Sequence, residues 1–131
     1  MTDVVDIRNL WSAFRRGGVD TVIHKNLNLR IEEGELLALV GGSGTGKTVL
    51  LRQMLGLEAP QRGTVTVLGE PAEALTRAGA ASRVGMLFQH GALYSAFTVL
   101  ENIAFPLREL KTLPADLVRD AAMVKLQMVG L

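Results

Sequence analysis

The sequence contains no cysteine among its 131 residues. A disulfide framework and a zinc site with thiolate ligands are therefore excluded, and the composition suits a reducing compartment. Acidic residues stand at Asp3 and Asp6, where a secretory signal peptide needs a basic and then an apolar stretch, so export by that route is not expected. No window approaches the roughly 20 consecutive apolar residues of a membrane-spanning helix, which leaves a peripheral role at any membrane.

An excess of charge of one sign is also missing. The 14 basic and 13 acidic residues are interspersed and give a formal net charge of +1. Proteins that bind nucleic acid usually cluster lysine and arginine on one surface, so nucleic acid is not an expected partner. Hydrophobic residues make up 48% and charged residues 21% of the chain, which is typical of a globular protein with one core of ordinary size.

The most informative motif present is G-x-x-x-x-G-K-[ST] at residues 41–48. In such a loop, backbone N–H groups and the positive end of the following helix bind the phosphates of a nucleoside triphosphate. The Lys47 ammonium can reach the β and γ oxygens, and the Thr48 hydroxyl can bind Mg²⁺. The predicted nucleotide-binding residues of the loop are Gly41, Gly42, Ser43, Gly44, Thr45, Gly46, Lys47 and Thr48.

The segments around this motif have the order that a phosphate-binding loop needs. Residues 36–40 form an unbroken apolar run, which predicts a buried parallel strand. Residues 48–55 carry helix formers, and Gly56 suits the end of a helix. A second buried strand is predicted at residues 83–88, and it ends at Gln89, where open α/β sheets usually meet their ligands.

Antiparallel strands are predicted on both sides of this region. Leu27, Leu29 and Ile31 alternate with polar residues, residues 4–7 suggest an earlier strand, and residues 15–20 read as the turn between them. A short β-branched strand follows at residues 64–68. Helices are predicted at residues 99–107, interrupted by Pro106, and at residues 114–129, where Pro114 suits the first helical position and Gly130 the end. In the second helix one shared apolar face is expected, formed by Leu117, Ala121, Val124 and Met128.

These pieces, in this order and over the whole chain, resemble the nucleotide-binding subunit of ABC transporters. The resemblance implies an α/β fold, the ABC-type nucleotide-binding domain of the P-loop NTPases, in truncated form. The antiparallel β subdomain and a partial parallel α/β core would occupy about residues 1–90. The Q-loop and the start of the helical subdomain would occupy about residues 89–131 of the same domain.

The resemblance also assigns roles to two residues outside the loop. Phe14 stands where the family has the aromatic residue that stacks on adenine, although it could instead fill the small antiparallel core. Gln89 stands at the Q-loop position, where its amide can bind Mg²⁺ and meet the attacking water. Lys47 and Gln89 are thus the predicted catalytic residues, Thr48 and Gln89 the predicted metal ligands, and ATP and Mg²⁺ the predicted ligands. His24 and His90 are expected to be ordinary hydrogen-bonded or solvated side chains.

Residues 88–109 are similar to the Mla-type branch of this family, which moves phospholipids between bacterial membranes. In the family, the region after the Q-loop receives a helix of the membrane permease, so a permease is expected to dock near residues 89–109, on the cytoplasmic face of the bacterial inner membrane. A second copy of the subunit would complete the ATP sites. An exposed groove is expected, although its residues could instead be core; they are Leu93, Tyr94, Phe97, Val99 and Phe105.

The family's signature sequence, Walker B acids and switch histidine lie downstream of the segment that this chain matches. The chain is therefore expected to be about the first half of a subunit, inactive in hydrolysis and poorly folded by itself. Three alternatives stay open: another P-loop enzyme such as a kinase or GTPase, an ABC-type ATPase of DNA repair or translation, and a non-catalytic nucleotide-binding module.

Overall fold

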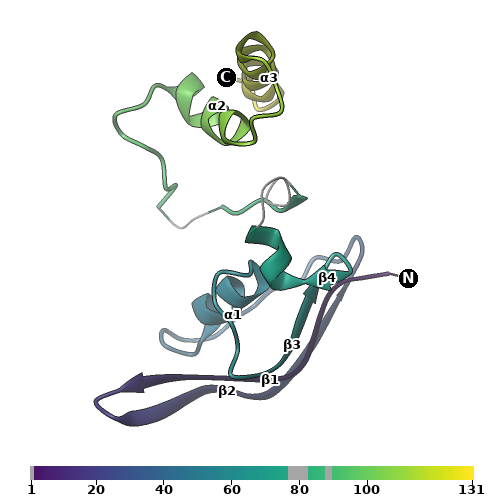
Figure 1. Ribbon diagram of the computed structural model, residues 1–131, viewed down its shortest axis with the longest axis vertical. Coiled ribbons are helices and arrows are strands. Elements are labelled where there is room, and N and C mark those ends of the chain that lie inside the picture. The colour runs from purple at the N-terminus through teal and green to yellow at the C-terminus, as the bar shows by residue number, and fades with distance from the viewer. Residues whose placement is uncertain (1, 77–82, 88–89) are drawn as a thin grey trace. The chain divides into compact units, whose positions relative to one another are not determined.

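The computed structural model describes residues 2–76, 83–87 and 90–131 (Figure 1). The chain divides into two compact units, Met1–Val84 and Gly85–Leu131. Each unit has its own hydrophobic core. The assignment of both parts to one domain, with a division near residue 90, stays a prediction.

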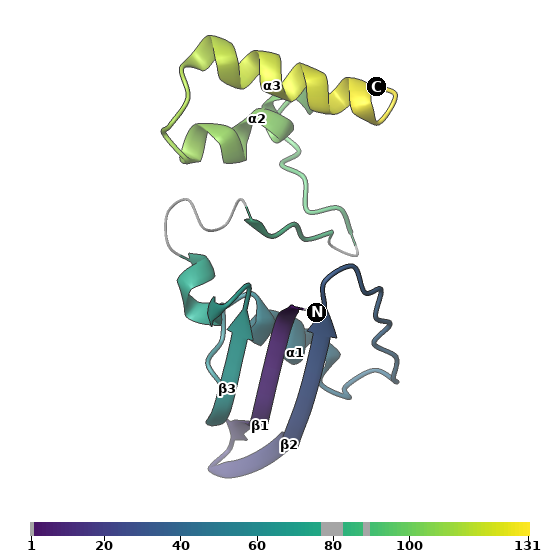
Figure 2. The ribbon, with the colours of Figure 1, turned by 90° about the vertical axis from the view of Figure 1, so that its right-hand side faces the viewer.

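The first unit is built on an antiparallel sheet with the strand order β2-β1-β3-β4, and Figure 2 shows β2, β1 and β3 side by side. The central strand β1 (Asp3–Arg16) pairs with β2 (Val19–Glu32) on one side and with β3 (Arg62–Val67) on the other. The short strand β4 (Glu70–Pro71) follows β3 at the edge. The three antiparallel strands predicted from alternation and β-branched residues are confirmed.

Glycine and left-handed residues form the turns of both hairpins. Gly17 and Gly18 join β1 to β2 with φ angles of 59° and 80°, and Leu68 and Gly69 join β3 to β4 with 53° and 82°. Two-residue turns with positive φ at both positions match the twist of antiparallel strands. The predicted turn at residues 15–20 is therefore confirmed.

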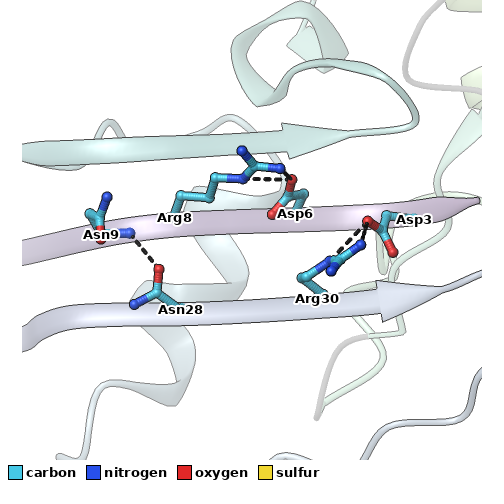
Figure 3. A network of polar contacts seen from close by, with 6 residues as sticks. All are labelled: Asp3, Asp6, Arg8, Asn9, Asn28 and Arg30. Atoms are coloured by element: carbon cyan, nitrogen blue, oxygen red, sulfur yellow. Dashed lines mark hydrogen bonds and ion pairs between the residues drawn. The ribbon is translucent and has the colours of Figure 1, made fainter.

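Polar contacts form within β1 and between β1 and β2 (Figure 3). Arg8 pairs with Asp6 inside β1, whereas Arg30 and Asn28 of β2 contact Asp3 and Asn9 of β1. Arg30 Nε donates to Asp3 Oδ2 at 2.9 Å, and the Asn9 N–H donates to Asn28 Oδ1 at 2.9 Å (Figure 3). The hydrogen bond to Asp3, and then the charge of Asp3, raise the pKa of the Arg30 guanidinium. Exposed pairs of this kind stabilise a fold weakly, so their main effect is on the alignment of the strands.

Helix α1 (Lys47–Met54) packs on one face of this sheet (Figure 1). Leu50 of α1 is buried against Ile7 and Leu10 of β1, and the core continues into the 3₁₀ helix η1 (Ala72–Thr76). Gly56 ends α1 with a φ of 74°, its N–H bonds to the Gln53 carbonyl, and the next N–H bonds back to Arg52. These two backbone hydrogen bonds form a Schellman motif, so the predicted helix and its glycine end are confirmed.

The two predicted parallel strands are not formed in the described residues. Residues 36–40 and 84–87 have no strand pairing, and Leu36, Val40 and Leu87 are 99%, 86% and 91% exposed. A central parallel strand needs neighbours that complete its hydrogen bonds on both sides. Within the described ranges, every strand belongs to the antiparallel sheet. The apolar runs therefore mark residues that favour burial, but no neighbouring strand covers them here.

The second unit consists of helices α2 (Val99–Glu109) and α3 (Ala115–Met128). The N-cap residue Thr98 accepts a hydrogen bond from the Glu101 N–H, and the Glu101 carboxylate accepts one from the Thr98 N–H, both at 3.1 Å. This capping box fixes the start of α2. Pro106 lies inside α2, so the helix runs past it to Glu109 instead of being interrupted as predicted.

Helix α3 begins and ends close to the predicted residues. Pro114 is its N-cap rather than its first helical residue, and Gly130 follows its end with a φ of 82°. Its packing face differs from the prediction, because Val118 and Ala122 are buried against α2. The predicted face is largely exposed, with Leu117, Val124 and Met128 all in contact with solvent. None of the helices that the structure describes is both long enough and apolar enough to cross a membrane.

Candidate phosphate-binding site

The predicted phosphate-binding residues form one continuous loop that leads into α1. Gly46 is the N-cap of α1 and has a φ of 91°, which a residue with a side chain rarely adopts. No side chain caps the first N–H groups of α1, and the first helical turn contains no acidic residue. The start of α1 therefore presents free N–H donors and a positive dipole end, which is an arrangement that binds anions.

The Lys47 side chain folds back over the same loop. Its Nζ donates to the carbonyl oxygens of Gly41 and Gly42, each at 2.6 Å, and lies 3.3 Å from Thr45 Oγ1. Among the described residues, no carboxylate forms an ion pair with Lys47. A formal positive charge is therefore held over the loop by neutral oxygens alone.

The remaining loop residues fix its shape or face solvent. Thr45 Oγ1 donates a hydrogen bond to the Gly42 carbonyl at 2.8 Å. A Cβ added at Gly41 would lie 2.8 Å from the same Thr45 Oγ1. Ser43, Gly44 and Thr48 are exposed. Thr48 is the second residue of α1 and is exposed, so a bound metal ion could reach its hydroxyl.

His24 is a contact of this loop that the sequence interpretation missed. The residue is 7% exposed, and its Nε2 lies 3.0 Å from the Gly46 carbonyl oxygen. A Cβ added at Gly46 would lie 2.6 Å from the same Nε2 and closer still to Ile23. Strand β2 therefore packs directly against Gly46, the N-cap residue of α1. The strand pattern around His24 does not specify which other segment its side chain contacts, so no signal in the sequence predicts this contact.

A buried polar pair ties β1 to α1. Ser12 and Gln53 are both buried, with Ser12 Oγ 3.1 Å from Gln53 Oε1 and 2.7 Å from Gln53 Nε2. Because buried polar groups without partners are costly, this pair favours one placement of the helix on the strand. The sequence offers no local signal for it, since the two residues lie 41 positions apart.

Phe14 lies on β1 two positions after Ser12, and its side chain is 48% exposed. Its ring is not among the residues of the hydrophobic core, so a ring face is accessible from solvent. The residue just before it, Ala13, is bound through both of its backbone groups by the side chain of Gln61.

The predicted catalytic residue Gln89 lies outside the described residues.

Exposed aromatic residues gather in the second unit. The rings of Tyr94 and Phe97 are 4.9 Å apart between centroids, and Phe105 lies 5.3 Å from Tyr94. A groove of about 600 Å³ runs beside them, lined by residues that include Leu93, Tyr94, Phe97 and Val99. Four of the five residues predicted to form a groove thus line one, and Phe105 packs on their rings.

Asn102 holds the segment that carries these aromatic residues. Its Oδ1 accepts from the Tyr94 N–H at 2.9 Å, and its Nδ2 donates to the carbonyls of Tyr94 and Thr98 at 3.2 and 2.9 Å. One side chain on α2 therefore fixes the loop that precedes the helix. Sequence interpretation missed this role, because an asparagine inside a helix has no distinctive pattern.

Comparison with known proteins gives a consistent result. Residues 24–130 match the family described as ABC transporter. The chain is 39% identical over 132 residues to the intermembrane phospholipid transport system ATP-binding protein MlaF of Haemophilus influenzae, and 40% identical over 134 residues to MlaF of Escherichia coli K12. These alignments cover 98% and 100% of this chain and 48% of each relative, so the chain spans about half the length of the curated relatives it matches.

A solved structure resembles the fold over nearly the whole chain. It is the dimeric post-hydrolysis state of the ATP-binding cassette MJ0796 bound to ADP and Pi, with a TM-score of 0.80 and 28% sequence identity. The match covers 97% of this chain and 57% of that one. The fold is therefore that of an ATP-binding cassette, represented in part.

Proposed function

The chain belongs to the ABC transporter family, and on this premise we propose that it binds ATP at residues 41–48 as part of a transporter ATPase subunit. The observation that carries the proposal is the Lys47 ammonium, which lies over a loop of neutral oxygens beside the uncapped start of α1. A triphosphate brings the negative charge that this arrangement lacks.

In the complete subunit, the proposed reaction is ATP + H₂O → ADP + phosphate. Lys47 would stabilise the charge that develops on the γ-phosphoryl oxygens as water attacks. The neutral amide of Gln89 would orient that water. Mg²⁺ bound by Thr48 and Gln89 would neutralise charge between the β- and γ-phosphates. Lys47 and Gln89 are the catalytic residues that we assign within these 131 residues.

We further propose that the 131-residue chain alone binds ATP without sustained hydrolysis. In the family, the signature sequence and the Walker B acids complete the site, and neither motif occurs in this sequence. Two copies of the complete subunit would enclose ATP between them. The dimeric state of the solved relative MJ0796 supports this arrangement.

We propose phospholipid as the transported substrate. The relatives named for intermembrane phospholipid transport align with the chain over 98–100% of its length. The match includes residues 88–109, the segment whose sequence resembles the Mla-type branch. This segment would contact the permease, and the permease would place the subunit on the cytoplasmic face of a bacterial inner membrane. The exposed groove beside Tyr94 and Phe97 supports docking there, because exposed apolar clusters usually mark interfaces.

The proposal is tested first by nucleotide preference. ATP and GTP are titrated separately, with Mg²⁺, into the protein as its gene encodes it. We expect saturable binding of ATP at least as tight as that of GTP. Clearly tighter binding of GTP would favour a GTPase. Membrane extracts are then tested for a permease that co-purifies with the protein, and its consistent absence would favour an ABC-type ATPase without a transport role.

A further inference from the structure

The side chain of Gln61 acts on β1 as a neighbouring strand would. Its Oε1 accepts a hydrogen bond from the Ala13 N–H at 2.8 Å, and its Nε2 donates to the Ala13 carbonyl. Both backbone groups of one strand residue are therefore paired by a single primary amide. A primary amide is the side-chain group that can do this, since it carries a donor and an acceptor side by side.

This contact lies directly before the start of β3 at Arg62. The last pair between the two strands is Trp11 with Arg62, and the Gln61 N–H donates to the Trp11 carbonyl at 2.9 Å. Residues of an antiparallel strand direct their N–H and C=O alternately to the two sides. The next groups on the β3 side of β1 are those of Ala13, and the Gln61 side chain pairs with them. The ladder is thereby extended by one residue beyond the strand.

Past this point, β2 is the strand that pairs with β1 in the described part of the chain. Phe14, Arg15 and Arg16 pair with β2, and Val19 opposite Arg16 is exposed. A hairpin of two strands is marginally stable in water unless further contacts hold it. The Gln61 amide is such a contact, and it is applied at the residue that immediately precedes Phe14.

We propose that Gln61 is a positioning residue for the base of the nucleotide, which it serves by fixing the backbone before Phe14. This inference rests on the proposed binding of ATP with adenine stacked on Phe14. Stacking depends on the ring being held in place, because a ring that must be ordered on binding loses part of the interaction energy. Gln61 contacts β1 and would not contact the nucleotide.

The test compares two ligands, ATP and inorganic tripolyphosphate, which has the phosphates without a base. Gln61→Met keeps the length of the side chain and removes both hydrogen bonds. In the protein as its gene encodes it, we expect this variant to bind ATP about three- to tenfold more weakly, since part of the stacking is lost. Binding of tripolyphosphate is expected to be unchanged. Gln127→Met is the matched control, because Gln127 is exposed on α3 and has no side-chain hydrogen bond in the described structure.

A double variant separates positioning from general stability. In the Phe14→Ala background, Gln61→Met is expected to have no further effect on ATP affinity, because no ring remains to be positioned. Equal losses for both ligands, no loss for either, or an undiminished Gln61 effect without the ring would each overturn the inference. If Phe14→Ala itself weakens ATP and tripolyphosphate equally, the proposed stacking is wrong and the inference falls with it.

Gln61→Glu gives a second measurement that does not depend on the folding of Gln61→Met. A carboxylate can still accept a hydrogen bond from the Ala13 N–H, but it has no donor for the Ala13 carbonyl and repels the partial negative charge of that oxygen. We expect the same selective loss of ATP affinity. Wild-type affinity for ATP in Gln61→Glu would overturn the role of the amide donor.

Discussion

At the scale of single residues, Lys47 has hydrogen-bond partners within its own loop. Its ammonium is bonded to the carbonyls of Gly41 and Gly42, so phosphate oxygens would share or compete for its three N–H donors. The gain in binding is the difference between a charge-assisted bond to an anion and bonds to neutral carbonyls. That difference, rather than the full strength of an ion pair, sets the expected effect of removing the lysine.

Lys47→Ala is therefore expected to weaken ATP binding about ten- to a hundredfold, which corresponds to ~1.5–3 kcal/mol. The measurement is titration with ATP and Mg²⁺. Lys125→Ala, which removes a lysine from α3, serves as the control and is expected to leave the affinity unchanged. If Lys47→Ala bound ATP as tightly as the wild-type protein, the phosphate-binding loop would be assigned wrongly.

Gly46 allows a second residue-scale prediction. Alanine there must adopt a φ near 91° and place its Cβ 2.6 Å from His24 Nε2, so we expect Gly46→Ala to lower the free energy of unfolding by at least ~2 kcal/mol. Gly44→Ala is the matched control, because its φ of 80° is similar but nothing lies within 4 Å of the added Cβ. Unfolding in urea, followed by a signal that comes from the first unit, measures the free energy of unfolding of both variants. Equal destabilisation by the two substitutions would mean that the contact with β2 is unimportant.

At the scale of elements, local patterns predict those parts of the fold that local interactions specify. Alternation at Leu27 and Leu29 predicts β2, and Gly56 and Gly130 predict helix ends that the structure closes with backbone hydrogen bonds. The apolar run at residues 36–40 predicts a strand, and this prediction is wrong, because these residues pair with no strand among those that the structure describes. Such a run indicates a preference for burial, whereas a strand needs a partner that the run itself cannot specify.

The contacts of the candidate site also fall into two classes, those that a local sequence pattern predicts and those that depend on tertiary packing. The motif at residues 41–48 could be recognised from spacing alone, because phosphate binding there uses consecutive backbone groups. The roles of His24, Gln61 and Asn102 could not. Each of these side chains bonds to the backbone of a different segment, so its role depends on tertiary packing, which no local pattern encodes.

The aromatic groove of the second unit gives a prediction for the unit formed by α2 and α3. Tyr94→Ala combined with Phe97→Ala is expected to reduce co-purification of the permease without changing ATP affinity, since both rings lie in the second unit and line its groove. Leu117→Ala on α3 is the control, because Leu117 is exposed but lies outside the groove. Normal permease association of the double variant would return these rings to a purely structural role.

At the scale of the whole molecule, two segments expose large apolar side chains. Leu36 and Val40 lie before the phosphate-binding loop, and Leu87 lies at the start of the second unit. Surfaces of this kind favour contact with other protein surfaces. These exposed side chains therefore favour association of the 131 residues when they are taken alone.

We expect the isolated 131-residue chain to associate at micromolar concentration and to show no sustained ATP turnover. Sedimentation velocity measures the association, and phosphate release measures the turnover. Leu36→Ser together with Leu87→Ser is expected to reduce the association, since it removes two of the most exposed apolar side chains. A monodisperse monomer of the unaltered chain with steady turnover would contradict both expectations.

The buried pair of Ser12 and Gln53 has a consequence for how the two ends of a nucleotide are recognised. Ser12 lies two positions before the ring proposed to meet the base, and Gln53 belongs to the helix proposed to meet the phosphates. In the proposed binding mode this pair would set the span between the two subsites, and a nucleotide of matching length would contact both of them, the second contact being intramolecular. Ser12→Ala is thus expected to cost ATP more affinity than it costs adenosine or tripolyphosphate measured singly, because only a ligand that bridges both subsites is sensitive to their spacing.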